Sequence, residues 1–202
     1  MKLYFSPGAC SLAPHIVLNE LGLAHETEKV DLAAKKTAGG ADFTQINPKG
    51  YVPALALDNG QMLTEVQVLL RYLADQKPDA GLIPKPLTPE RYRVEEWQNF
   101  IATELHKGYS PLFRPTTPEE YKTIARDNLA KRLQLVDKHL AGKQYLMGDK
   151  FTVADAYAFT ILRWSTVTKV DLSPYANIKA YMERVAARPK VAETLKQEGL
   201  LK

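Results

Sequence analysis

The first 80 residues combine strand and helix patterns. The apolar run 3–5 is interrupted at Ser6-Pro7-Gly8, and the segment 27–31 is a second candidate strand. Between them the run 12–21 has helical character and stops near Gly22, a residue that often follows the last turn of a helix. The chain therefore begins with the order strand, helix, strand.

A hairpin and a second helix follow this unit. Asn59-Gly60 lies in the middle of the apolar segment 54–63, and this dipeptide between two apolar runs is a strong hairpin signal. Helical periodicity then runs from Val66 to about Asp75. Thr64 and Gln67 have the spacing of a capping box at the start of this helix. The pattern predicts an α/β N-terminal domain in the order βαβ, then ββα.

The rest of the chain has only helical periodicity. It follows a joint around 77–86 that contains three prolines and one glycine, which are typical of a linker. Thr88-Pro89 has the form of a helix start, and Thr152 with Asp155 has the form of a capping box. We expect an α/β domain over residues 1–78, a linker over 79–87 and an all-α domain over 88–202.

Composition limits the class of protein. The chain is 45% hydrophobic and 25% charged, which disfavours disorder, and its net charge of +4 is not gathered into a basic stripe. No apolar stretch approaches the roughly 20 residues of a membrane span, and the N-terminus lacks a signal-peptide pattern. The single cysteine cannot form an internal disulfide, so a reducing compartment fits. We expect a cytoplasmic protein that binds neither nucleic acid nor membrane.

That cysteine, Cys10, lies between the first strand and the first helix. The unpaired N–H groups and positive end of a helix favour thiolate over thiol, so this position predicts a reactive or sulfur-binding residue. The alternative is a small residue packed under the turn. A second cysteine in a Cys-x-x-Cys arrangement is missing, because position 13 is Ala13. Dithiol redox chemistry within one chain is excluded.

Two further segments have both a structural and a functional interpretation. Val52-Pro53 opens a strand, and a cis peptide there would present the Val52 backbone to an extended peptide, although this stretch alone favours an ordinary loop. Glu65 begins a helix, where a carboxylate is favourable without any ligand. The functional interpretation is that the Glu65 carboxylate binds the ammonium group of a ligand, while the N–H groups at the helix start bind the carboxylate of the same ligand.

A polar stripe marks the helix that begins near Pro89. At ~100° per residue, Val94, Trp97, Ile101 and Leu105 share the core face. Asn99, Thr103 and His106 lie together on the opposite face. This stripe is either a solvated surface or the wall of a cleft, in which His106 would serve as a donor to sulfur or carboxylate.

The stretches named so far match one family in order and spacing. The chain resembles the glutathione S-transferases, and among them the bacterial beta class, whose members carry a cysteine where most classes use Tyr or Ser. The matching stretches are 7–11, 47–50, 52–55, 63–65, 101–107 and 151–157. They span both predicted domains, and together they are far more specific than any one of them.

This resemblance implies a thioredoxin-like N-terminal domain that binds glutathione and a helical domain that shapes a hydrophobic site. Cys10 would face the glutathione sulfur, Val52 would pair with its cysteinyl backbone, and Lys35 would approach its glycine carboxylate. Glu65 and the backbone of Val66 would hold the γ-glutamyl end. The residues implied in glutathione binding are Cys10, Lys35, Val52, Pro53, Glu65, Val66, Asn99, Thr103, Glu104, Leu105 and His106, with Cys10 and His106 catalytic.

The implied reaction is conjugation of the glutathione thiolate to hydrophobic electrophiles by a homodimer, without a metal or other cofactor. Thiol-transferase or peroxidase side activity through Cys10 belongs to the same expectation. Candidates for lining the hydrophobic site are Tyr109, Phe113 and Trp164. One departure concerns Val66, where relatives often carry Ser or Gly, so a hydroxyl contact to glutathione is lost. The alternative is a non-catalytic protein of the same fold that binds ligands or partners.

Overall fold

The computed structural model describes residues 1–201, and its internal contacts divide the chain into two packed units. The first unit contains Met1–Gly81 together with residues 188–201, and the second contains Leu82–Ala187. The helix α10 (Pro189–Gln197) packs against α1 (Leu12–Leu21), and Arg188 forms an ion pair with Glu20. The end of the chain thus packs with the first unit, whereas the predicted boundaries place it with the helical domain.

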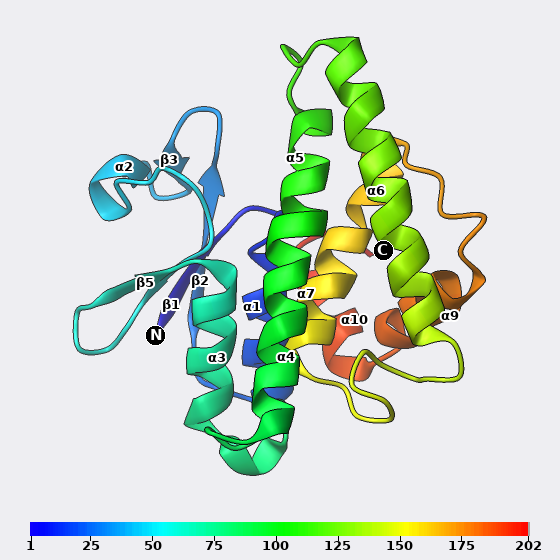
Figure 1. Cartoon of the computed structure of the whole chain (residues 1–202). Coiled ribbons are helices and arrows are strands. Elements are labelled where there is room, and N and C mark those ends of the chain that lie inside the picture. Colours follow the sequence, from blue (N-terminus) through cyan, green and yellow to red (C-terminus); the bar gives the residue numbers. More distant parts are fainter. Residues whose placement is uncertain (202) are drawn as a thin grey trace. The chain divides into compact units, whose positions relative to one another are not determined.

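The first unit is built on a mixed sheet in the strand order β3-β2-β1-β4-β5 (Figure 1). The central strand β1 pairs in parallel with β2 and antiparallel with β4, and β4 and β5 form the predicted hairpin. The strands are β1 (Lys2–Phe5), β2 (Glu26–Asp31), β3 (Lys36–Thr37), β4 (Ala54–Ala56) and β5 (Met62–Thr64). Its other helices are α2 (Phe43–Ile46), α3 (Val66–Gln76) and the 3-10 turn η1 (Pro78–Ala80). The sequence pattern missed β3 and α2 because they are only two and four residues long.

The packing of helix α1 explains why its sequence is apolar on nearly every side of the helix. It packs against both α3 and α10, and every one of its residues except Glu20 is buried. Pro14 is tolerated because it lies in the first turn, where the backbone N–H groups have no intrahelical partner. The helix ends at Gly22, whose φ of 58° is the left-handed conformation that glycine adopts without strain.

The second unit is entirely helical within the residues described. Its elements are α4 (Pro89–Phe100), the π-helical segment η2 (Ile101–His106), α5 (Lys107–Phe113), α6 (Glu119–Leu140), α7 (Val153–Leu162), α8 (Trp164–Thr168) and α9 (Ala176–Ala186). Helix α7 is central to this unit, since all its residues are buried and it packs against α4, η2 and α9 (Figure 1). No described helix of either unit has both the length and the apolar character needed to cross a membrane.

The helix starts predicted at Thr88 and Thr152 are confirmed. The Thr88 hydroxyl accepts a hydrogen bond from the N–H of Arg91 at the start of α4. The capping box of Thr152 and Asp155 is formed at the start of α7. The buried Asp155 carboxylate accepts from the N–H groups of Leu146 and Thr152 and from the hydroxyl of Tyr181. Burial raises the pKa of Asp155 to about 6 despite these donors, because a charge in the interior loses its hydration.

Candidate active site

Cys10 lies in the loop between β1 and α1, as predicted. Its side chain is half-buried, and its S–H donates to the backbone carbonyl of Val52 at 3.3 Å. The peptide bond between Val52 and Pro53 is cis, which confirms the backbone geometry on which the functional interpretation of this stretch depends. Two stretches separated by about 40 residues along the chain therefore meet at the thiol.

The structure contradicts the expectation that this position favours a thiolate. Burial raises the pKa of the Cys10 thiol to about 12, and the negative charge of Glu65 adds to the increase. The N–H groups of Cys10 and Ser11 act in the opposite direction, as the helix argument predicts, but their effect is smaller than the cost of desolvation. Cys10 is thus a protonated hydrogen-bond donor.

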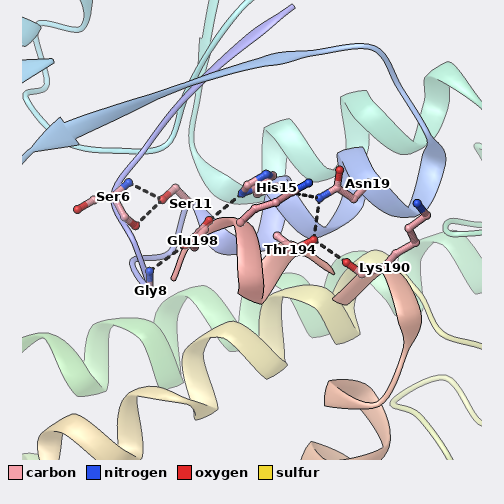
Figure 2. Close-up of polar contacts among 9 residues, drawn as sticks. Ser6, Gly8, Ser11, His15, Asn19, Lys190, Thr194 and Glu198 are labelled. Carbon is pink, nitrogen blue, oxygen red and sulfur yellow. Dashed lines mark hydrogen bonds and ion pairs between the residues drawn. The ribbon is translucent and has the colours of Figure 1, made fainter. Parts of the chain in front are cut away.

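A network from the end of the chain holds the loop that carries Cys10 (Figure 2). The Gly8 N–H donates to Glu198 Oε2 at 2.9 Å, and Glu198 Oε1 pairs with His15 Nδ1 at 2.9 Å. The Ser11 hydroxyl bonds both the N–H and the carbonyl of Ser6. Sequence reasoning assigned His15 no role, because its partner Glu198 lies 183 residues away along the chain.

Glu65 occupies a special backbone position at the start of α3. Its φ of 73° is rare for a residue with a side chain, and such outliers cluster at functional sites. One carboxylate oxygen accepts from Lys49 Nζ at 2.6 Å and from the Tyr51 hydroxyl at 3.0 Å. Neither partner was singled out from the sequence, although both belong to the loop that precedes the cis peptide.

The predicted capping box of Thr64 and Gln67 is wrong. Glu65 is the N-cap residue of α3, and no side chain caps the helix. Thr64 instead ends strand β5, where its hydroxyl accepts from Lys49 Nζ at 2.9 Å. The first-turn N–H groups of α3, beginning at Val66, consequently have no side-chain cap.

Lys35 reaches the same loop from a different direction. Its backbone has a φ of 55°, and its Nζ donates to the carbonyl of Gly50 at 2.7 Å. The structure therefore places the ammonium group of Lys35 beside the segment that leads to Val52. Lys35, Cys10, Val52 and Glu65 all contact the stretch 49–52 or belong to it.

In the second unit, the core face predicted for α4 and its continuation is largely confirmed. Val94, Ile101 and Leu105 are fully buried, so Leu105 is a core residue, whereas Trp97 is only half-buried. On the other side, the side chains of Asn99 and Thr103 are exposed. Thr103 donates its hydroxyl to the carbonyl of Asn99 at 3.0 Å. Glu104, between these two faces, forms an ion pair with Arg132 of α6.

His106 does not remain on the exposed stripe with those two residues. It is half-buried, and its Nδ1 lies 2.7 Å from the hydroxyl of Tyr157 on α7. Tyr157 itself is 2% exposed. Sequence reasoning included Tyr157 in a matching stretch but gave it no role.

The three aromatic candidates converge, but they differ in accessibility. Trp164 lies with its ring centroid 5.1 Å from that of Phe113 and 6.2 Å from that of Tyr109. Tyr109 is fully buried and bonds the Ser165 hydroxyl at 2.5 Å, so it is a core residue rather than the surface of a site. Phe113 is exposed and Trp164 half-buried, which leaves these two as the apolar surface.

Comparisons with known proteins identify the family. The chain matches the family models of the glutathione S-transferase N-terminal domain over residues 8–76 and C-terminal domain over residues 100–189. It is 50% identical to glutathione S-transferase GstA of Escherichia coli O157:H7, over 99% of this chain and all of the relative.

Solved structures give the same result. A beta class glutathione S-transferase of Sphingomonas chungbukensis has a TM-score of 0.96 and 48% identity, with both chains fully covered. A sphingomonad glutathione S-transferase complexed with glutathione has a TM-score of 0.95 and 46% identity over 99% of this chain and all of that one. The first unit thus carries the thioredoxin-like fold of this family, and the second is its all-helical domain. The chain belongs to the glutathione S-transferase family, in the bacterial beta class, and is a transferase rather than a non-catalytic protein of that fold.

Proposed function

We propose that the protein binds glutathione through its first unit and conjugates the thiolate to hydrophobic electrophiles. In this reaction the sulfur attacks an electrophilic carbon, a carbon–sulfur bond forms, and the bond from that carbon to its leaving group breaks. The thiol proton of glutathione passes to solvent. The observation that carries the proposal is the Cys10 thiol, which is held as a donor against the Val52 carbonyl at the start of α1.

The roles of the first unit follow from its geometry. The Cys10 S–H exchanges the Val52 carbonyl for the glutathione sulfur, and the Val52 backbone pairs with the cysteinyl residue beside Pro53. Glu65 holds the γ-glutamyl ammonium, and the N–H of Val66 holds its carboxylate at the uncapped start of α3. Lys35 takes the glycine carboxylate. The sphingomonad relative was solved with glutathione, which supports this ligand.

The chemical task is to lower the pKa of the glutathione thiol. A decrease of two pKa units requires about 2.7 kcal/mol of differential stabilisation of the thiolate. A donated hydrogen bond to a charged acceptor contributes about 1.5–3 kcal/mol, and the positive end of α1 adds to it. Cys10 as a neutral donor, with its high pKa, is suited to this role because it does not compete for the negative charge.

The second unit supplies the remaining contacts. His106 acts as a donor to glutathione, while Asn99, Thr103 and Glu104 present polar groups. Leu105 contributes packing, and Phe113 with Trp164 forms an apolar surface for the electrophile. We place this assembly in a cytoplasmic homodimer, as the family resemblance implies, with no metal and no cofactor other than glutathione as co-substrate.

A thiol-transferase or peroxidase route through Cys10 is the weaker candidate. It requires Cys10 as a thiolate nucleophile, and burial opposes that form. Comparison of Cys10→Ser with Cys10→Ala separates the two roles, because serine keeps an O–H donor and alanine keeps none.

The test is turnover of glutathione with a chlorinated nitroaromatic. We expect Cys10→Ser to retain at least threefold more activity than Cys10→Ala, which itself keeps measurable turnover. Equal and complete loss in both variants would assign Cys10 the nucleophilic role. Absence of turnover by the unmodified protein with a range of such electrophiles would refute conjugation.

A further inference from the structure

The pair formed by His106 and Tyr157 joins two segments that lie 51 residues apart in the chain. Tyr157 belongs to α7, all of whose residues are buried, so its hydroxyl has a fixed position. The distance of 2.7 Å between the Tyr157 oxygen and His106 Nδ1 is that of a short hydrogen bond. Both residues lie within the second unit.

The π-helical segment explains why His106 reaches Tyr157. In η2 the N–H of Lys107 donates to the carbonyl of Ala102, five residues earlier. A π-turn advances about 80–85° per residue instead of ~100°, so over Ile101–His106 the direction of the last side chain changes by about a quarter turn. This change moves His106 away from the exposed direction of Thr103, which regular α-helical spacing predicts for it.

Aromatic rings fix the plane of the imidazole from two directions. The Trp164 ring lies 4.8 Å from the His106 ring at an angle of 75°, and the Tyr157 ring lies 5.9 Å away at 88°. A side chain enclosed by near-perpendicular rings and bonded at Nδ1 has little freedom to rotate. The position of Nε2 is therefore determined by the protein before any ligand binds.

We propose that Tyr157 is a positioning residue for the transferase reaction and acts through His106. Its O–H donates to Nδ1, which keeps the proton of the neutral imidazole on Nε2. His106 then offers an Nε2–H donor to glutathione, and Tyr157 itself does not touch the substrate. This inference rests on the role of His106 in the proposed function.

The first measurement needs no variant. Nitrogen-15 NMR of labelled imidazole side chains, with His106 assigned through the spectrum of His106→Gln, reports which ring nitrogen carries the proton. Near pH 8 and without glutathione, we expect the Nε2–H tautomer for His106. An Nδ1–H tautomer would overturn the proposal, whether or not the protein binds glutathione.

The second measurement uses Tyr157→Phe with Tyr175→Phe as its control. Tyr175 is also a buried tyrosine of the second unit, and its hydroxyl donates one hydrogen bond to the carbonyl of Ala130. Tyr157→Phe should shift His106 toward a mixture of tautomers and lower kcat/KM about tenfold. Tyr175→Phe should leave both unchanged.

The outcomes separate this inference from the proposed function. An unchanged His106 spectrum in a folded Tyr157→Phe, or an equal loss of kcat/KM in both variants, would refute the role of Tyr157. Failure of the unmodified protein to bind glutathione, with the Nε2–H tautomer present, would refute the function and leave the tautomer assignment standing.

Discussion

The starts of α1 and α3 in the first unit differ from the start of α7 in the second. No side chain caps α1 or α3, whereas the capping box of Thr152 and Asp155 closes α7. We call the first two the open helix starts and the third the closed one. The N–H groups at the closed start are used for stability. At the start of α1 the N–H groups of Leu12 and Ala13 bond the carbonyls of Ala9 and Cys10, whereas the first-turn N–H groups of α3 have no side-chain acceptor and suit a ligand carboxylate.

The comparison also shows how hydrogen-bond donors offset the effect of burial on the pKa of a buried acidic group. Burial raises the pKa both of Cys10 near an open start and of Asp155 at the closed one. Asp155 receives several hydrogen bonds that favour its charged form, and its pKa stays near 6. Cys10 has fewer such donors, so it remains a thiol until an incoming anionic sulfur can use its proton.

The largest expected effect concerns the reactivity of Cys10. With a pKa of about 12 instead of 9.0, its thiolate fraction at pH 7 is lower by about a thousandfold than that of an ordinary thiol. Alkylation by iodoacetamide, followed by intact-protein mass spectrometry, should be slow at pH 7 and accelerate up to at least pH 10. An alkylation rate that reaches its plateau below pH 8 would contradict this pKa and support the thiolate that the position at a helix start predicts. Free glutathione under the same conditions serves as the reference.

The closed helix start should dominate stability. Asp155→Ala leaves buried donors of Leu146, Thr152 and Tyr181 without their acceptor, and we expect a loss of about 3 kcal/mol in the free energy of unfolding. Urea denaturation measures this free energy of unfolding for the unmodified protein and for the variant. The control is Asp127→Ala, which removes an exposed carboxylate of α6 and should change stability by less than about 0.5 kcal/mol. Similar losses in the two variants would show that the capping carboxylate of α7 contributes no more to stability than an exposed carboxylate.

Asp155 also gives a pH dependence with a defined sign. Its pKa is about 6 in the folded chain and near 3.8 when unfolded, so the folded state binds the proton more tightly between these values. Its contribution is therefore fully present below pH 4 and is lost as the pH rises through 6. Unfolding of the unmodified protein and of Asp155→Ala, compared at pH 4 and pH 7, should show that the difference in stability is larger at pH 4. A difference that grows toward pH 7 would contradict this sign.

The smallest expected effect is at the open start of α3. Val66→Ser adds a hydroxyl where the γ-glutamyl carboxylate is proposed to bind, and one added hydrogen bond should tighten glutathione binding by about 1 kcal/mol. Val68→Ser is the control, since Val68 is exposed on the same helix. Isothermal titration calorimetry should find tighter binding for Val66→Ser alone. Equal or weaker affinity of that variant would reject the contact.

Local signals allowed much of the architecture to be predicted. Asn59-Gly60 fixed the hairpin, and Thr152 with Asp155 fixed a helix start, because the interactions concerned span only a few residues. At the start of α3 the same kind of local signal was wrong. Thr64 continues the sheet and bonds Lys49, a contact that depends on the fold of the preceding loop.

The features of the site that escaped prediction depend on distant contacts. The pKa of Cys10 depends on burial, which a helix-end argument does not include. Glu198 reaches Gly8 across nearly the whole chain, and Tyr157 reaches His106 only because a π-turn changes the side chain's direction. A helical projection at a constant ~100° per residue cannot predict such a turn.

The central claim is that the open helix starts of the first unit bind glutathione. The most direct measurement is a titration of the nitrogen-15 labelled protein with glutathione, followed through its backbone amide signals. We predict saturable shifts at Cys10, Val52 and Val66, with one glutathione bound per chain, and no shift at Thr152 of the closed start. Unchanged signals at the first three residues under saturating glutathione would contradict the account.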